Sequence, residues 1–267
     1  SMSRLTDEYG DYVYIGSNRN LMYFGVLQYA DSLDNKALLT DILTNGEVPT
    51  DCTNYECYQA IIARYNLKTG EIEKYFDSAD YGLDSPFGLI WGFRAAVTFK
   101  GALYMNANSV LRGSCLVRIS GNDQKEPEML TGVGGVGSSG VSSCTMRAMC
   151  VSEDGSTMYV GGMESSNGRD CYTIYKTADG ETYEQIVGPK TDVTVFDRYE
   201  GAEYRTDGGD LWEITEYGGK LLVTLMTRKG AMVFTGQYDS TAGQWAWEEF
   251  AGEQNSNYDP GFGNVDN

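Results

Sequence analysis

The chain has 267 residues, 41% of them hydrophobic, which is enough to bury the core of one large β domain or of two small ones. Its 20 basic and 38 acidic residues give a net charge of −18, which argues against a surface for nucleic acid or an anionic membrane, because phosphate binding depends on clustered Lys and Arg. The absence of histidine excludes Ser-His and Cys-His nucleophile systems, and no apolar run approaches the roughly 18 residues of a membrane helix.

A unit of four short strands begins near the amino end of the chain. Residues 12–16 match the second strand of this unit, and residues 60–67 and 71–76 match its third and fourth strands. The turn between the last two strands carries Gly70 at the position that needs a left-handed backbone. Residues 18–58 form an insertion within this first unit, and apolar spacing of three and four predicts a helix inside the insertion.

The same unit then recurs three times in full. Its first strand is expected at 93–99, 146–151 and 211–217, its second at 102–106, 158–161 and 220–224, its third at 115–120, 172–177 and 231–235, and its fourth at 127–130, 182–187 and 244–250. Tyr104 and Tyr159 hold the same place in the second strand, 55 residues apart, and Leu222 follows 63 residues later. A four-stranded unit repeated at this length is typical of a β-propeller, whereas a β-sandwich or a β-helix does not predict this order of short and long links.

We therefore predict an all-β fold, with a single β-propeller domain over residues 1–267 that is built from four-stranded antiparallel blades. Four blades are visible, followed by the start of a fifth. Two arrangements stay open: a ring of four blades with a tail, or an incomplete part of a larger ring. An open ring exposes sheet edges, which self-association or a partner chain would cover.

The hairpin at residues 174–183 resembles the Asp-box of sialidase-like propellers, in which a Ser or Thr, an Asp, a Gly and an aromatic residue occupy the turn between the third and fourth strands. Asp179 and Gly180 are adjacent here, where the pattern has one residue between them. Residues 259–267 look like the segment that leads into the first strand of bacterial propeller repeats. The resemblance covers the chain loosely and implies a bacterial propeller of the broad Asp-box or kelch-like kind. Because Asp-boxes are structural even in enzymes, it implies no activity.

The six cysteines bear on location. Cys52 and Cys57 lie close together in a loop. A small disulfide between them fits an exported protein, so we expect an extracellular or cell-surface location. Cys150 lies within a strand pattern and is expected to be a buried thiol.

Metal ligands are scarce in this sequence. With no histidine, no Cys-x-x-Cys and no second close cysteine pair, the ligands of a structural zinc site are missing. We expect no cofactor, and keep calcium as the one ion that clustered carboxylates of so acidic a chain would suit. In a propeller Cys144 falls on the same face as Cys115 and Cys171, and its disulfide partner stays open between them.

Unequal links between strands identify a candidate binding face. The turns from first to second strand and from third to fourth strand are tight, whereas the other links are long. In a propeller these two sets emerge on opposite faces, so the long loops gather on one face, where binding residues concentrate. Aromatic rings beside Asn, Asp and Arg suit the faces and hydroxyl groups of sugar rings. The candidate ligand-binding residues are Arg19, Trp91, Arg94, Arg147, Arg169, Asp170, Tyr204 and Arg205.

Two of these arginines recur at one place in the repeat. Arg94 and Arg147 stand at the start of the first strand, which lines the channel of a propeller, and Trp212 stands near that place in the fourth unit. A guanidinium group binds the two oxygens of a carboxylate, so these residues suit an anionic ligand. The alternative is a structural ion pair that recurs with the repeat.

The leading functional hypothesis is a non-catalytic exported or cell-surface propeller that recognises a glycan or a protein through its long-loop face. One alternative is a sialidase-like glycoside hydrolase or lyase, which needs an arginine cluster, a Tyr nucleophile with a carboxylate base, and a separate acid. Residues 203–205 and Asp170 supply these types, although no spacing fixes them together. A second alternative is a structural piece of a larger propeller assembly.

Overall fold

The computed structural model describes residues 1–17, 60–82, 84–109, 113–130, 145–166, 169–188, 191, 210–227 and 230–251. Its strands are β1 (Met2–Asp7), β2 (Gly10–Gly16), β3 (Ile61–Asn66), β4 (Ile72–Asp77), β5 (Ile90–Phe99), β6 (Ala102–Ser109), β7 (Gly113–Ile119), β8 (Glu128–Leu130), β9 (Thr145–Val151), β10 (Met158–Ser166), β11 (Arg169–Thr177), β12 (Glu184–Val187), β13 (Asp210–Tyr217), β14 (Lys220–Thr227), β15 (Gly230–Asp239) and β16 (Gln244–Ala251). Two 3-10 helices, η3 (Ser78–Asp80) and η4 (Phe87–Leu89), lie between β4 and β5. The described strands form four antiparallel sheets of four, each in chain order, which confirms the predicted units.

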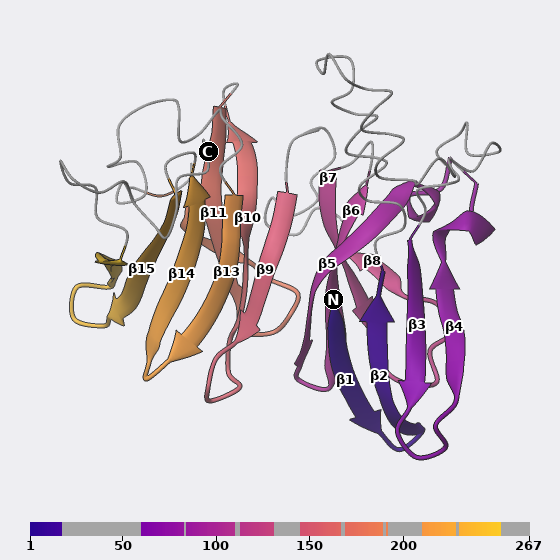
Figure 1. The fold of residues 1–267 in the computed structure, drawn as a ribbon. Coiled ribbons are helices and arrows are strands. Elements are labelled where there is room, and N and C mark those ends of the chain that lie inside the picture. The colour runs from indigo at the N-terminus through magenta and orange to yellow at the C-terminus, as the bar shows by residue number, and fades with distance from the viewer. Residues whose placement is uncertain are drawn as a thin grey trace, which may run out of the picture.

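The sheets follow one another like the blades of a propeller (Figure 1). Their first strands lie side by side, since β1 packs on β5, β5 on β9, and β9 on β13. Hydrophobic clusters fill the three gaps between successive sheets. Across the described ranges, no comparable packing joins β13 back to β1, so the four blades form an open arc. The predicted all-β propeller architecture is confirmed.

Strand alternation explains how one sheet serves two neighbouring cores. In β6, Leu103 and Met105 belong to the cluster shared with the first sheet, whereas Tyr104 belongs to the cluster shared with the third. Successive side chains of a strand point to opposite faces, so an apolar residue at every position buries both faces of the sheet. An inner blade is therefore stable only between two others.

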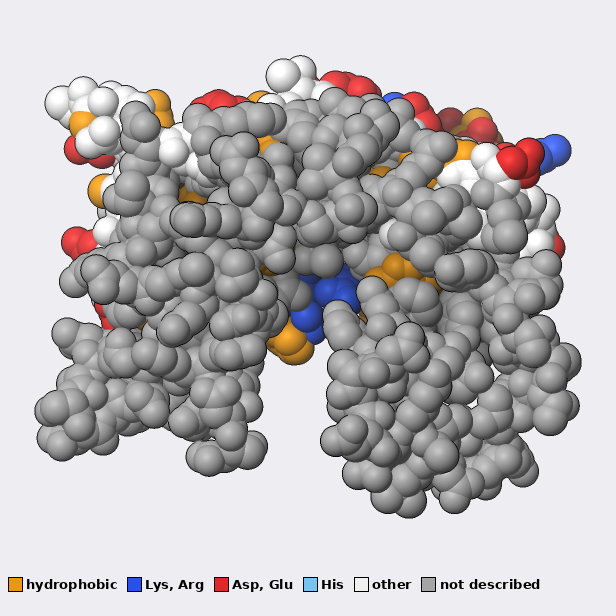
Figure 2. Space-filling model, turned by 90° about the horizontal axis from the view of Figure 1, so that it is seen from above, with side chains coloured by type: hydrophobic (Ala, Val, Ile, Leu, Met, Phe, Trp, Pro, Cys, Tyr) orange, Lys and Arg blue, Asp and Glu red, His pale blue; other side chains and the backbone are white. Residues whose placement is uncertain are grey.

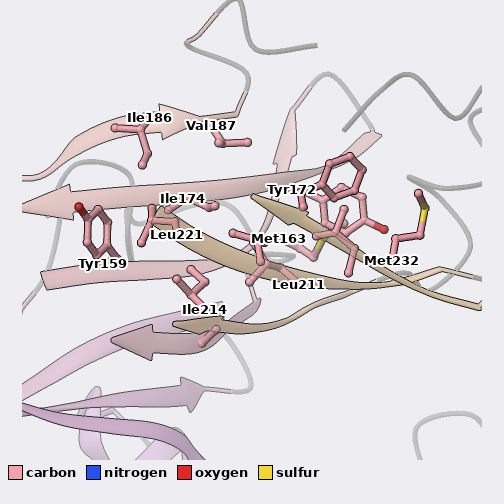
Figure 3. Packing of buried hydrophobic residues seen from close by; sticks show 14 residues of the cluster. Tyr159, Met163, Tyr172, Ile174, Ile186, Val187, Leu211, Ile214, Leu221 and Met232 are labelled. Atoms are coloured by element: carbon pink, nitrogen blue, oxygen red, sulfur yellow. The ribbon is translucent and has the colours of Figure 1, made fainter. Parts of the chain in front are cut away.

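The cluster between the third and fourth sheets holds β9 beside β13. Figure 3 shows Tyr159 and Ile174 of the third sheet together with Leu211, Ile214 and Leu221 of the fourth. All five are at most 7% exposed. Burying a side chain of this size contributes about 1.5–3 kcal/mol to folding stability. This packing therefore fixes the backbone that carries the residues at the axial edge of the gap.

Short hairpin turns lie together at one end of the blades, at the bottom of Figure 1. Gly70 has the left-handed backbone expected of it, with φ of 77°. The β5–β6 turn uses Lys100 and Gly101 with φ of 47° and 79°, the positive pair that a two-residue hairpin favours. The opposite strand ends, where the long links begin, therefore define the other face.

The turn at Asp179 has a structural role in the fold. Its carboxylate accepts hydrogen bonds from the backbone N–H groups of Thr182 and Glu181, which hold the pKa of Asp179 at about 2. Gly180 has φ of 79°, and a Cβ there would collide with the Tyr104 hydroxyl of the second sheet. The turn thus locks the third blade to the second.

The sequence analysis missed one strand, and two of its expectations concern residues outside the described ranges. The strand β1 was missed by the repeat pattern, because Leu5 is its one buried apolar residue and the other positions alternate weakly. The described residues contain no α-helix, and the helix expected within 18–58 lies outside them, as does the segment 259–267.

Candidate functional site

The first strands of the second, third and fourth sheets carry a β-bulge at the same level. The bulge includes Arg94 in β5, Arg147 in β9 and Trp212 in β13. In β13, for example, Leu211 and Glu213 pair with consecutive residues of β14 and leave Trp212 between them. A bulge leaves a residue outside the ladder and re-aims its side chain, and bulges are frequent beside active sites. We call Arg94, Arg147 and Trp212 the axial row.

Two members of the axial row touch across the gap between the third and fourth sheets. The guanidinium carbon of Arg147 lies 3.3 Å from the centroid of the Trp212 ring. Trp212 is 46% exposed, so the stacked pair keeps an accessible surface. Such a cation–π contact contributes about 0.5–2 kcal/mol and fixes the orientation of both groups.

Arg94 is held in a similar way within its own strand. Its guanidinium carbon lies 5.4 Å from the centroid of the Trp91 ring, and Trp91 is itself at a second bulge of β5. Both side chains are partly buried. The row therefore presents two guanidinium groups, each against an indole ring.

The hollow at the middle of the long-loop side contains basic side chains (Figure 2). The described arginines of the inner strands near this face are Arg94 and Arg147, because β5 and β9 run from this face toward the hairpin turns. A cationic hollow in a chain of net charge −18 attracts anions locally despite the acidic exterior.

One carboxyl group adjoins the axial row. Glu213 follows Trp212 directly and pairs with Thr224 of β14, where the ladder resumes after the bulge. Burial raises the pKa of Glu213, while a backbone hydrogen bond from Ile214 opposes the shift. A carboxylic acid with a raised pKa holds its proton closer to neutrality, as a general acid must.

The candidate residues named from the sequence lie partly inside and partly outside the described ranges. The structure describes Trp91, Arg94 and Arg147, and brings Arg94 and Arg147 to matching places on adjacent inner strands. Arg169 and Asp170 lie in β11 with their side chains outside the described part. The candidates that lie wholly outside it are Arg19, Tyr204 and Arg205.

Two residues near the row were missed by sequence reasoning. Trp212 was noted for its place in the repeat but not as a ligand-binding residue, and Glu213 was not singled out. The signal was present, since Trp212 occupies the repeat position of Arg147. The pKa shift of Glu213 depends on desolvation of its carboxyl group in the folded protein, which a sequence does not show.

The described cysteines lie between neighbouring sheets. Cys150 packs in the gap between the third and fourth sheets, and burial raises its pKa to about 12. Cys115 is buried between the first and second sheets. The pair Cys52 and Cys57 lies outside the described residues, as do Cys144 and the side chain of Cys171, so those pairings stay predictions.

The described residues bear on metal binding and on membrane insertion. Within those ranges no group of three or more His, Cys, Asp or Glu is arranged to hold a metal ion. Nor does any helix in those ranges have the length and apolar character needed to cross a bilayer.

No family model matches the chain, and no curated protein matches it. Solved structures with similar folds include a puromycin-hydrolyzing peptidase of Mycobacterium tuberculosis, 11% identical with a TM-score of 0.43 over 93% of this chain and 32% of the peptidase. They also include a GH43 β-xylosidase/α-arabinofuranosidase from a compost microbial metagenome, 13% identical with a TM-score of 0.40 over 93% of this chain and 76% of that one. A third is a GH32 β-fructofuranosidase of Bombyx mori, 12% identical with a TM-score of 0.37 over 72% and 43%.

This comparison overturns one expectation. The expectation of a non-catalytic binding propeller is contradicted, because several of the similar structures are glycoside hydrolases. At these identities and TM-scores the likeness identifies neither substrate nor catalytic residues, so the chemistry rests on the axial row.

Proposed function

We propose that the chain is a glycoside hydrolase or lyase that acts on an acidic sugar bound at the axial row. The observation that carries the proposal is the stacked pair of Arg147 and Trp212, held 3.3 Å apart on adjacent blades by matching bulges. An exposed indole ring packs against the C–H face of a sugar, and a guanidinium group binds a carboxylate through two parallel hydrogen bonds. One acidic sugar can use both groups at once.

The two arginines would divide the binding of charge. Arg147 lies against Trp212 and Arg94 against Trp91, so each guanidinium group is pre-oriented and loses little entropy on binding an anion. A lyase gains further from this arrangement, because removal of the proton next to the carboxylate places negative charge on that group, which the guanidinium stabilises.

Glu213 is the described acid beside the row. Its raised pKa fits proton donation to the oxygen of the leaving group, which both hydrolysis and elimination require. For the second carboxylate or the tyrosine of such a mechanism we propose Asp170, in β11, and Tyr204, the residues that the sequence suggested.

We propose further that the enzyme is exported and has a disulfide between Cys52 and Cys57. An exported enzyme with an Asp-box-like turn at 174–183 fits the close pair Cys52 and Cys57, whose disulfide is tested by peptide mass before and after reduction. A mass increase of the loop peptide on reduction supports export, and an unchanged mass contradicts it.

Turnover of defined sugars tests the proposal. The chain is incubated with oligogalacturonate, glucuronate-containing oligosaccharides and sialyllactose, with neutral xylo-oligosaccharide as the control, and products are separated by chromatography. We expect product from an acidic substrate, lost at least 100-fold in Arg147→Ala. Arg4→Ala is the matched control, because Arg4 is an exposed arginine of β1 that pairs with Asp11 away from the row. Equal rates for both variants, or no product from any acidic sugar, contradict the proposal.

A further inference from the structure

The half of β6 nearest the long-loop face carries a buried side-chain amide that makes no hydrogen bond with the described residues. Asn106 has no exposed surface, and neither its Nδ2 nor its Oδ1 has a hydrogen-bond partner among the described residues. Asn122 shows the ordinary arrangement, since its amide donates to Leu5, Asp7 and Gly10 and accepts from the Tyr14 hydroxyl.

The position of Asn106 relates it to the axial row. In the β5–β6 ladder the bulge that contains Arg94 and Ala95 lies directly across from Asn106. By the alternation of β6, Asn106 faces the third sheet, as Tyr104 does, and that sheet carries Arg147 on its inner strand. The amide therefore lies in the gap between the two arginine-bearing blades.

The cost of a buried amide without hydrogen bonds indicates that a group outside the described residues forms hydrogen bonds with it. Each buried donor or acceptor left without a partner costs about 1–3 kcal/mol, whereas an apolar side chain of similar shape would cost nothing there. An amide offers two N–H donors and one carbonyl acceptor, which match a hydroxyl group together with an oxygen of the same ligand. Ring hydroxyls of a sugar supply that combination.

We propose that Asn106 binds a ring hydroxyl of the acidic sugar whose carboxylate lies against Arg94. The inference rests on the proposed function and makes Asn106 a specificity-determining residue for hydroxylated carboxylates over simple anions. Because Asn106 has no exposed surface, this proposal requires that the side chains over it move when the sugar enters.

Substitution by leucine separates a ligand-binding amide from a structural one. Asn106→Leu keeps the shape of the side chain and removes its polar ends, and Asn122→Leu is the matched control at a buried amide with partners. We expect Asn106→Leu to keep or raise the melting temperature and to weaken glucuronate binding at least 10-fold by calorimetry, with acetate binding unchanged. Asn122→Leu is expected to lower the melting temperature.

Any of three results would overturn the inference. The first is a melting temperature lowered by Asn106→Leu as much as by Asn122→Leu. The others are glucuronate binding that is undetectable in the wild type and a glucuronate affinity that Asn106→Leu leaves unaltered. The proposed function fails separately. If Arg147→Ala abolishes turnover while Asn106→Leu leaves glucuronate affinity intact, the enzyme stands without this subsite. If glucuronate binding depends on Asn106 but no sugar is turned over, the subsite stands and the enzyme fails.

Discussion

At the scale of single residues, the axial row depends on side chains that leave the regular ladder of the inner strands. Arg147 and Trp212 meet because each is the extra residue of a bulge. A residue inside the ladder would point to one of the two faces of its sheet, and hydrophobic clusters fill the gaps between neighbouring faces. The site is thus formed from positions that the hydrophobic cores do not use.

Trp212 is predicted to contribute more to sugar binding than to stability. Because Trp212 is 46% exposed, Trp212→Ala should lower the free energy of unfolding mainly by the loss of its contact with Arg147, about 0.5–2 kcal/mol. It removes the ring from both Arg147 and the sugar, so kcat/KM on an acidic substrate should fall about 10- to 100-fold, as expected for the loss of an aromatic contact of about 1.5–3 kcal/mol. Trp212→Phe should recover part of this loss, and a Phe variant as inactive as the Ala variant would argue against stacking.

Glu213 gives the proposal a pH signature. Since burial raises its pKa, the folded protein holds this proton to a higher pH than the unfolded chain does. Activity that needs the protonated acid should therefore fall as the pH rises through that pKa, and folding stability should decline over the same interval. Glu213→Gln should remove the basic limb of the pH–rate profile along with most of the activity. An unchanged basic limb would assign the proton donor to another group.

At the scale of elements, the short turns carry the contacts between neighbouring blades. A side chain at Gly180 is predicted to be destabilising for two reasons. Its Cβ would collide with the Tyr104 hydroxyl, and the backbone of Gly180 is in the left-handed region. Gly101→Ala is the matched control, since its φ is also 79° and a Cβ there meets no described atom within 4 Å. Gly101→Ala should lose about 1–2 kcal/mol in urea unfolding. Gly180→Ala should lose about 1–3 kcal/mol more through overpacking, and equal losses would show that the Tyr104 contact is unimportant.

Acid should weaken the same turn. The pKa of Asp179 is held at about 2 by backbone N–H groups, below its value of 3.8 in the unfolded chain. Its contribution is therefore present above the unfolded pKa and is lost as the pH falls through about 2. Asp179→Asn should flatten the loss of melting temperature between about pH 4 and pH 2, whereas a wild-type slope in the variant would mean that other carboxylates account for it.

The elements could be predicted well from the sequence, and for a definite reason. Apart from β1, the blade strands have apolar residues at a spacing that reveals them, and tight hairpins carry a glycine with positive φ, such as Gly70 or Gly101. The site could be predicted only in part. Repeat alignment found Arg94 and Arg147, whereas the contact of Arg147 with Trp212 depends on bulges, which shift register without a distinctive sequence. Asn106 was invisible, because an amide without partners looks like any other until its surroundings are known.

At the scale of the whole molecule, the stability of each blade depends on packing against its neighbours. Each sheet packs on its neighbours in the arc, as in other repeat architectures. Ile214→Ala in the gap between the third and fourth sheets should cost about 2–5 kcal/mol locally. Hydrogen exchange should then show loss of protection in β13–β16, with β1–β4 retaining theirs. Uniform loss across all four sheets would show that the arc unfolds as one unit.

The central claim is that the axial row binds and turns over an acidic sugar. Comparison of wild type, Arg147→Ala and Arg4→Ala on oligogalacturonate and glucuronate-containing substrates, with neutral xylo-oligosaccharide beside them, tests it most directly. We predict products from an acidic substrate alone, unchanged in Arg4→Ala and reduced at least 100-fold in a folded Arg147→Ala. Product formation that survives Arg147→Ala, or that favours the neutral substrate, would contradict the account.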